Sequence, residues 1–239
     1  LTDKADSSYF SVIMPDGLKA GSNGQLVNES EIGGGKKRMD WQSAYPIAYY
    51  LISVAVSNYM DFSFTSEIVE FETNVLVQNF IPNNTNYLDN NDWYIYRTHQ
   101  MLDVLSNRWG LYPHHTEKSG HCIVPLGGGM EHQTMTTLGN FDFRLVVHEL
   151  AHSWFGNYVT CASWQDIWIN EGFASYGEYL GEEKIQPEGY DLNWLIGCQN
   201  LAKERPTGSV YVPFEELNSV ARIFDYRLSY RKGACLVHM

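Results

Sequence analysis

The segment from residue 148 to 176, HELAHSWFGNYVTCASWQDIWINEGFASY, constrains the fold more than any other part of the sequence. His148 and His152 are four residues apart, so on a helix they lie one turn apart on the same face. Eighteen residues separate His152 from Glu171, which heads a second apolar-patterned segment. This spacing predicts two consecutive helices whose polar side chains meet at one point.

Imidazole nitrogens and carboxylate oxygens are zinc ligands, and three protein ligands leave a fourth tetrahedral position for water, as in catalytic zinc sites. We therefore interpret His148, His152 and Glu171 as the ligands of one zinc ion. Glu149 would lie beside the metal, where a carboxylate can take a proton from the attacking water and pass it to the leaving amine. Glu178, two turns after Glu171, shares its face and could hydrogen-bond a ligand histidine.

The alternative interpretation is that HELAH is only a charged stretch of an amphipathic helix. By composition, the H-E-x-x-H pattern is expected in about one or two chains per hundred of this size. An amphipathic helix does not account for the second glutamate and the apolar pattern that follows it. We therefore favour zinc.

Composition excludes some classes of partner and site. The 239 residues include 28 acidic and 16 basic side chains, a net charge of −12, which argues against a nucleic-acid partner and leaves peptides open. The most apolar run, YPIAYYLISVAV, is shorter than the roughly 20 residues that span a bilayer, so no membrane segment is expected. The four cysteines stand at positions 122, 161, 198 and 235, with no C-x-x-C pair among them, so a thiolate zinc site is not expected. We favour buried free thiols over a disulfide.

The order of strand-like and helix-like segments predicts an α+β protein. Residues 8 to about 80 favour strands, with glycine-rich turns between them. After the polar loop PNNTNYLDNND, apolar residues recur at helical spacing and predict a helix that ends at Gly110. A short strand should run into the glycine turn of HCIVPLGGG. Further helices are expected over residues 141–157, 171–184, 186–204 and 228–239.

HELAHSWFGN and WINEGFASY, together with GGGMEHQT at 127–134, resemble the zinc aminopeptidase family of aminopeptidase N, a gluzincin family. The resemblance implies that residues 1–61 are the end of an N-terminal β-sandwich domain. It implies that residues 62–239 are a thermolysin-like catalytic domain, truncated at its C-terminus. It also implies one zinc ion per chain, with the ligands and the base that the spacing indicates.

The resemblance assigns roles that spacing alone does not. LSYRKGA resembles the family segment whose tyrosine hydrogen-bonds the tetrahedral oxyanion, which gives Tyr230 that role. GGGMEH resembles the family's G-x-M-E-N exopeptidase motif, so Glu131 would bind the free ammonium group of the substrate. Gly128 and Gly129 would lie along the peptide backbone, since glycine permits close approach. His132 stands where the family most often has asparagine.

The expected function is hydrolysis of the N-terminal peptide bond of peptides that have a free N-terminus. Two alternatives stay open: a thermolysin-type endopeptidase, and a zinc-bound, non-catalytic peptide-binding module. Glu131 favours the exopeptidase, while Glu149 and Tyr230 favour catalysis over binding alone. The sequence opens without methionine and stops inside an apolar stretch, so further domains of a parent chain are expected as partners. No chemistry is assigned to the other loop histidines at positions 114, 115, 121 and 132.

Overall fold

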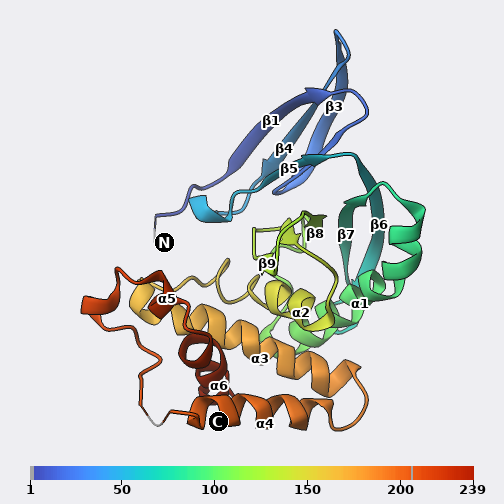
Figure 1. Ribbon diagram of the computed structural model, residues 1–239. Coiled ribbons are helices and arrows are strands. Elements are labelled where there is room, and N and C mark those ends of the chain that lie inside the picture. The colour runs from blue at the N-terminus through green and yellow to red at the C-terminus, as the bar shows by residue number, and fades with distance from the viewer. Residues whose placement is uncertain (1–2, 206) are drawn as a thin grey trace.

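The computed structural model describes residues 3–205 and 207–239, which form an elongated β-rich arm above a larger body of sheet and helices (Figure 1). We call residues 8–57 the N-terminal β arm. Strands β1 to β5 lie in the arm, and β6 to β10 lie in the body. The strands are β1 (Ser8–Pro15), β2 (Lys19–Ser22), β3 (Gln25–Gly33), β4 (Lys36–Ser43), β5 (Val54–Ser57), β6 (Tyr59–Ile68), β7 (Thr73–Pro82), β8 (Ser119–Ile123), β9 (Gly129–Met130) and β10 (Thr136–Leu138).

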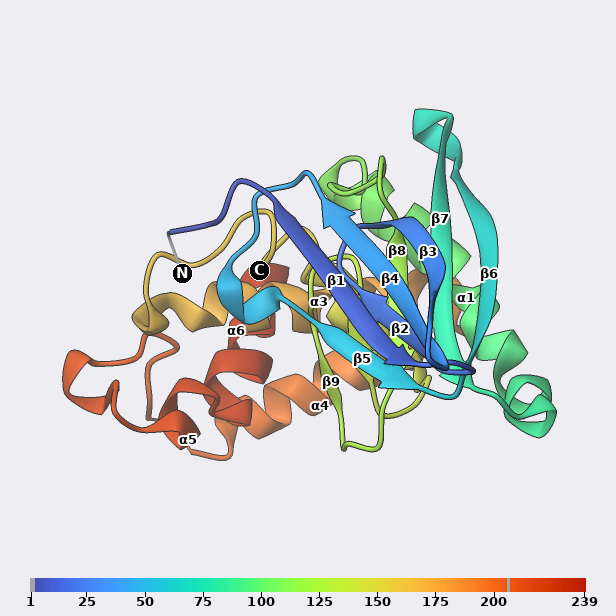
Figure 2. The same ribbon diagram turned by 90° about the horizontal axis from the view of Figure 1, so that it is seen from above.

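The arm contains a three-stranded antiparallel sheet in the order β1-β4-β3 and a β2-β5 pair (Figure 2). The predicted glycine turn joins β3 to β4. Gly33, Gly34 and Gly35 have φ values of 79°, 63° and 67°, which side chains other than glycine rarely adopt. This local conformation reverses the chain and sets the register of the hairpin.

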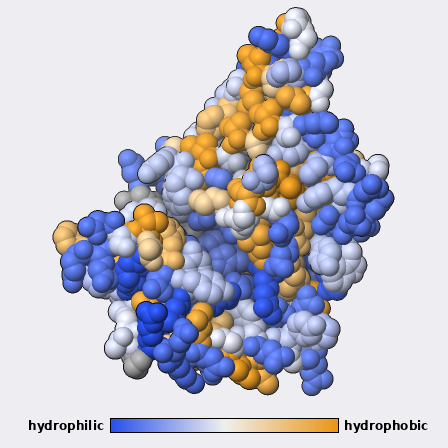
Figure 3. All heavy atoms as spheres, in the orientation of Figure 1, coloured by the Kyte–Doolittle hydropathy of each residue, from blue (hydrophilic) through white to orange (hydrophobic). Residues whose placement is uncertain are grey.

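Figure 3 shows that apolar side chains gather over the strands of the arm. The exposed apolar residues of these strands include Tyr9, Ile13, Val27, Ile32 and Val56. The arm therefore carries much of the apolar surface on this side of the molecule.

The body is built on a mixed five-stranded sheet in the order β6-β7-β8-β10-β9. β7 pairs parallel with β8, and β8 pairs parallel with β10, whereas β9 pairs antiparallel with β10. The long helix α1 (Thr85–Trp109) makes the crossover between β7 and β8. This topology leaves β9, with Gly129 and Met130, at the edge of the sheet.

Each face of the sheet has its own core, because neighbouring residues of a strand point to opposite sides. Ile81 and Ile123 pack with the helices of the body. Phe80 and Cys122, one position earlier in each strand, pack with the arm, whose buried Trp41 belongs to the same cluster. The arm is thus joined to the body through a continuous apolar core.

Helices cover the face of the sheet opposite the arm (Figure 1). α1 begins where the Asn84 side chain accepts a hydrogen bond from Asn86 N (3.0 Å), and it ends at Gly110 as predicted. The other helices are α2 (Phe143–Ala151), α3 (Ile167–Ile185), α4 (Tyr190–Lys203), α5 (Val220–Ile223), α6 (Gly233–His238), the π-helical turn η5 (Tyr226–Lys232) and the 3₁₀ turns η1 (Tyr49–Leu51), η2 (Val69–Phe71), η3 (Trp164–Asp166) and η4 (Phe214–Glu216).

Several boundaries differ from the sequence-based expectation: α3 begins at Ile167 instead of residue 171, and α4 begins at Tyr190 instead of residue 186. The helix expected over 141–157 ends at Ala151, because the next residues form tighter turns, with Ser153 N donating to Leu150 O (3.0 Å). The strand-like run IAYYLISVAV contains η1, where Leu51 is fully buried, and only the short strand β5. In both places tertiary packing overrides the local pattern.

The division between arm and body lies between β5 and β6, while the expected domain boundary after residue 61 falls inside β6. The boundary itself stays a prediction. Within residues 3–205 and 207–239, no helix is both long and apolar enough to cross a bilayer. All four cysteines are free thiols, as the sequence predicted.

Candidate metal centre

Helix α2 carries the two histidines and the glutamate between them. It starts at Asp142, whose carboxylate accepts hydrogen bonds from Arg144 N (3.1 Å) and Leu145 N (3.2 Å). His152 follows the last helical residue but keeps helical dihedral angles (φ −58°, ψ −22°). His148 and His152 therefore still share one face, although the helix is shorter than expected.

Helix α3 brings the third donor close because its glycines let α2 approach. A Cβ added to Gly177 would stand 2.6 Å from Ala151 Cβ, and one on Gly181 would stand 3.0 Å from Val147 Cγ2. Ala151 and Val147 both belong to α2. Any larger side chain at these two positions would push α2 away from α3, and with it the histidines away from Glu171.

His148, His152 and Glu171 each offer one donor atom, and the three atoms lie within 4.8 Å of one another. Glu171 Oε2 is 3.3 Å from His148 Nε2 and 3.4 Å from His152 Nε2. The donors are buried, and one nitrogen or oxygen from each of three side chains is a zinc-type ligand set. The structure thus brings together all three residues that the spacing selected.

The hydrogen bonds on the far side of each imidazole fix its orientation. His148 Nδ1 lies 2.9 Å from Glu178 Oε1, and His152 Nδ1 lies 3.0 Å from Phe155 O. Carboxylate and carbonyl oxygens only accept, so both Nδ1 atoms carry the proton. Each Nε2 faces Glu171 and would offer its lone pair to a metal ion bound between them. The residues present therefore fit a zinc ion.

Glu149 is buried beside these donors on α2 and points toward β9. Burial raises the pKa of Glu149 to about 7, against the opposing effect of His148 and His152. A carboxyl group with a pKa near neutral can both accept and return a proton. Its position against the edge strand suits it to act on a peptide lying there.

Gly128, Gly129 and Glu131 lie in the turn and edge strand around β9. Gly128 has a φ of 84°, which explains glycine at that position. Asn157 Nδ2 donates to the backbone oxygen of Glu131 (2.9 Å) and so ties this edge to the segment after α2. One carboxylate oxygen of Glu131, one of Glu149 and one nitrogen of His152 lie within 4.8 Å of one another. An extended peptide could pair with β9 and present its first residue to this cluster.

Tyr230 lies on η5 and stacks on His148, with ring centroids 5.8 Å apart and planes 16° apart. Burial, followed by the negative charges of Glu171 and Glu131, holds the pKa of Tyr230 well above its ordinary range. The phenol therefore stays protonated at neutral pH and can donate a hydrogen bond into the site.

A cavity of about 300 Å³ opens over the metal donors. It includes side chains that the sequence did not single out: Tyr50, Trp164 and Phe224 form part of its wall. Tyr50 comes from the N-terminal β arm, and no local signal connects it with the zinc motif. The cavity lining also includes Gly129, Met130, Glu131, His148, Glu149, His152, Ile167, Glu171 and Tyr230.

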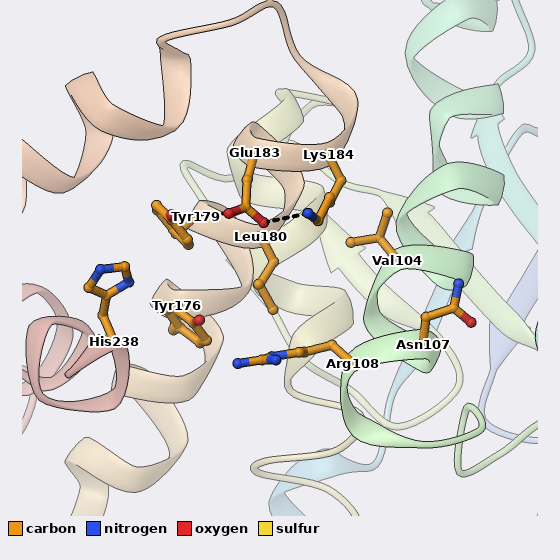
Figure 4. A pocket seen from close by; sticks show the side chains of 9 residues that line it. All are labelled: Val104, Asn107, Arg108, Tyr176, Tyr179, Leu180, Glu183, Lys184 and His238. Carbon is orange, nitrogen blue, oxygen red and sulfur yellow. Dashed lines mark hydrogen bonds and ion pairs between the residues drawn. The ribbon is translucent and has the colours of Figure 1, made fainter.

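A larger cavity, about 510 Å³, lies elsewhere and is lined by side chains of α1, α3 and α6 (Figure 4). Arg108 and Asn107 approach it from α1, and Glu183 pairs with Lys184 at its rim (3.0 Å). None of the metal donors lines it. Size alone would thus have selected the wrong place for the chemistry.

The remaining histidines stay outside the metal cluster. His114 and His121 are buried in the fold, where burial lowers the pKa of His114 to about 3 and that of His121 to about 4. His132 Nδ1 lies 2.9 Å from Thr137 Oγ1. His115 Nδ1 lies 3.1 Å from Tyr112 O.

The sequence and fold of this chain were compared with those of known proteins, and the similarities found are to zinc peptidases and aminopeptidases. Residues 128–239 match the model of the peptidase family M1 domain. Aminopeptidase N of Oryctolagus cuniculus is 42% identical over an alignment of 106 residues, and the match covers 40% of this chain and 11% of the relative. Aminopeptidase N of Canis lupus familiaris is 35% identical over an alignment of 172 residues, and the match covers 59% of this chain and 17% of the relative. The similarity to peptidase family M1 thus lies in residues 128–239, just under half of the chain.

A solved structure of an M1 zinc metallopeptidase from Deinococcus radiodurans, bound to a Tyr-Ser-Ala substrate, has the same fold with a TM-score of 0.82. It is 25% identical, and the match covers 99% of this chain and 52% of that chain. The α+β fold class is thereby confirmed, and family and neighbour together support zinc as the cofactor. The chain spans only 11% and 17% of the length of the two aminopeptidase N relatives. These matches therefore do not by themselves show the activity of the whole protein.

Proposed function

We propose that this chain is the zinc-binding catalytic part of an M1 aminopeptidase, which removes single residues from the free N-terminus of peptides. The observation that carries the proposal is the cluster of Glu131, Glu149 and His152, with donor atoms within 4.8 Å of one another. In a peptide, only the first residue has an ammonium group two bonds from its own carbonyl carbon. A carboxylate this close to the base can bind that ammonium only when the first peptide bond is the one attacked.

Each residue has a distinct part in the proposed reaction. A zinc ion held by His148, His152 and Glu171 would polarise the scissile carbonyl and make water more acidic. Glu149 accepts a proton from the attacking water and returns it to the leaving amine. Tyr230 donates a hydrogen bond to the oxyanion that develops on the carbonyl oxygen.

Substrate binding in this proposal uses the edge of the sheet. The peptide pairs with β9, and the absence of side chains at Gly128 and Gly129 leaves room for its backbone. Glu131 forms a charge-assisted hydrogen bond to the substrate ammonium. Glu178 holds His148 in place from behind, with its Oε1 atom 2.9 Å from Nδ1.

A thermolysin-type endopeptidase would use the same ligands and the same base but has no need for a carboxylate facing a substrate amine. A zinc-bound peptide-binding module would have no need for a buried base beside a neutral phenol. Glu131 argues against the first alternative, and the pair of Glu149 and Tyr230 argues against the second.

The test compares Glu131→Gln with the wild type on an aminoacyl anilide that has a free amine and on its N-acetylated form. Loss of one charge-assisted bond predicts a fall in kcat/KM of about 10- to 100-fold on the free amine. Little change is expected on the acetylated substrate. Glu183→Gln, at the rim of the larger cavity, is the matched control and should behave as the wild type. An equal loss on both substrates would refute the role of Glu131.

A further inference from the structure

The carboxylate behind His148 is itself held by two other elements. Glu178 on α3 uses Oε1 for His148, while its Oε2 accepts hydrogen bonds from Trp194 Nε1 and Arg231 Nη1, both at 2.8 Å. Glu178 is 5% exposed and Arg231 is 13% exposed at the side chain. A buried carboxylate with an arginine partner and a neutral donor on the same oxygen has little freedom to rotate.

Arg231 is fixed in turn by its surroundings. Its Nε donates to Tyr226 OH (2.7 Å), and its guanidinium lies 4.7 Å from the centre of the Tyr226 ring and 5.2 Å from that of Trp194. Arginine suits this position, since its planar group can stack on rings and still donate in the plane. These contacts aim Nη1 at Glu178.

Two neighbouring residues of η5 act on His148, one directly and one through Glu178. Tyr230 stacks on the imidazole directly, and Arg231, the next residue, reaches it through Glu178. Gly233 lies against Gly172 of α3, where a Cβ on Gly172 would stand 2.9 Å from the Gly233 carbonyl carbon. This close backbone contact holds η5 against the helix that carries Glu171 and Glu178.

We propose that Arg231 is a positioning residue, which orients His148 for metal binding by holding the Glu178 carboxylate in line with Nδ1. The inference rests on the proposed zinc site, but it concerns metal affinity and not turnover. Partners behind metal-binding histidines are typically worth 10- to 100-fold in metal affinity. Arg231 lies one hydrogen bond further from the metal site than Glu178, so we expect Arg231→Met to weaken zinc binding about 10-fold.

The chain provides a matched control one turn along α3. Glu182 is also a buried carboxylate, 3% exposed, and its side chain pairs with Arg144. Among the described residues, Arg144 is its one hydrogen-bond partner, and the pair does not reach His148. Arg144 and Arg231 line the same open cavity of about 370 Å³. Arg144→Met therefore removes an ion pair to a buried carboxylate of α3 without touching the metal site, although Arg144 is more exposed than Arg231, 49% against 13% at the side chain.

The experiment measures the Kd for Zn²⁺ of the full 239-residue chain by competition with a chromogenic chelator, with folding checked by circular dichroism. Arg231→Met should bind about 10-fold more weakly, and Arg144→Met should bind as the wild type. Arg231→Gln, which adds no apolar surface, should show the same loss and replaces Arg231→Met if that variant does not fold. Wild-type affinity in the folded Arg231 variant would overturn the inference.

A double variant separates positioning from general packing. If Arg231 acts through Glu178, adding Arg231→Met to Glu178→Gln should weaken zinc binding no further, since coupled residues are not additive. Full additivity would overturn the proposed route. A wild-type chain that binds no zinc would overturn the proposed function and this inference with it, whereas zinc binding that ignores Arg231 would overturn the inference alone.

Discussion

Gly129 lies directly against Glu149: a Cβ added to Gly129 would stand 2.6 Å from Glu149 Oε1 and 2.8 Å from its Cδ. No real Cβ atom makes so close a contact, so even alanine must displace the carboxylate. The proposed base therefore packs tightly against the edge strand on which we place the substrate. Glycine permits this close contact because it has no Cβ.

We expect Gly129→Ala to lower kcat at least about 10-fold, because a displacement of about 1 Å in a catalytic group can cost about 10²-fold. Zinc content, measured by mass spectrometry, should not change, since the ligands lie elsewhere. Gly127→Ala is the control, because a Cβ there meets nothing within 4 Å. Equal kcat values for Gly127→Ala and Gly129→Ala would contradict the prediction.

Glu149→Gln should keep the metal and lower kcat by about 10²-fold or more, the usual contribution of a general base. The amide is close to the carboxylate in shape but cannot accept the proton. Steady-state kinetics with parallel metal analysis distinguish this result from loss of zinc. An unchanged kcat with zinc present would remove Glu149 from the mechanism.

Tyr230→Phe should lower kcat by about 10²-fold while changing KM far less, because a donor to an oxyanion acts mainly in the transition state. The ring that stacks on His148 is kept, so the change isolates the hydroxyl. Tyr190→Phe, on α4 and outside the cavity lining, should leave both constants unchanged. A variant whose KM rises while kcat holds would instead indicate a role in substrate binding.

His121 should make the fold sensitive to acid. It is buried in β8, with Nδ1 2.8 Å from Asn79 Oδ1, and burial lowers its pKa from 6.5 to about 4. Between these values the unfolded chain binds a proton that the folded chain does not, so stability falls as the pH drops from 6.5 to 4. At about 1.4 kcal/mol per pKa unit, the loss is on the order of 3 kcal/mol.

Urea unfolding of the wild type and His121→Gln at pH 7 and pH 4 measures this contribution. From pH 7 to pH 4, the free energy of unfolding should drop by about 3 kcal/mol more in the wild type than in His121→Gln, because glutamine does not titrate in this range. The same drop in both proteins would assign the acid sensitivity to other groups, among them His114.

The sequence alone determined the features that depend on short-range geometry. His148 and His152 share a face because a helix repeats about every four residues, and the short extension beyond α2 preserved that relation. The turn at Gly33 to Gly35 follows from the φ values that only glycine adopts easily. The end of α1 at Gly110 is a similar local effect.

Only the tertiary structure decided which distant residues meet. Tyr50 comes to the cavity because the arm packs on the sheet through Trp41 and Phe80. Arg231 reaches Glu178 because Gly172 and Gly233 let α3 touch the start of α6, directly after η5. Such contacts come from the packing of whole elements, and no periodicity within one segment encodes them. Spacing could therefore predict the proposed metal donors and the contact of Glu178 with His148. It could not predict Arg231, which holds Glu178, or Tyr50, which lines the cavity.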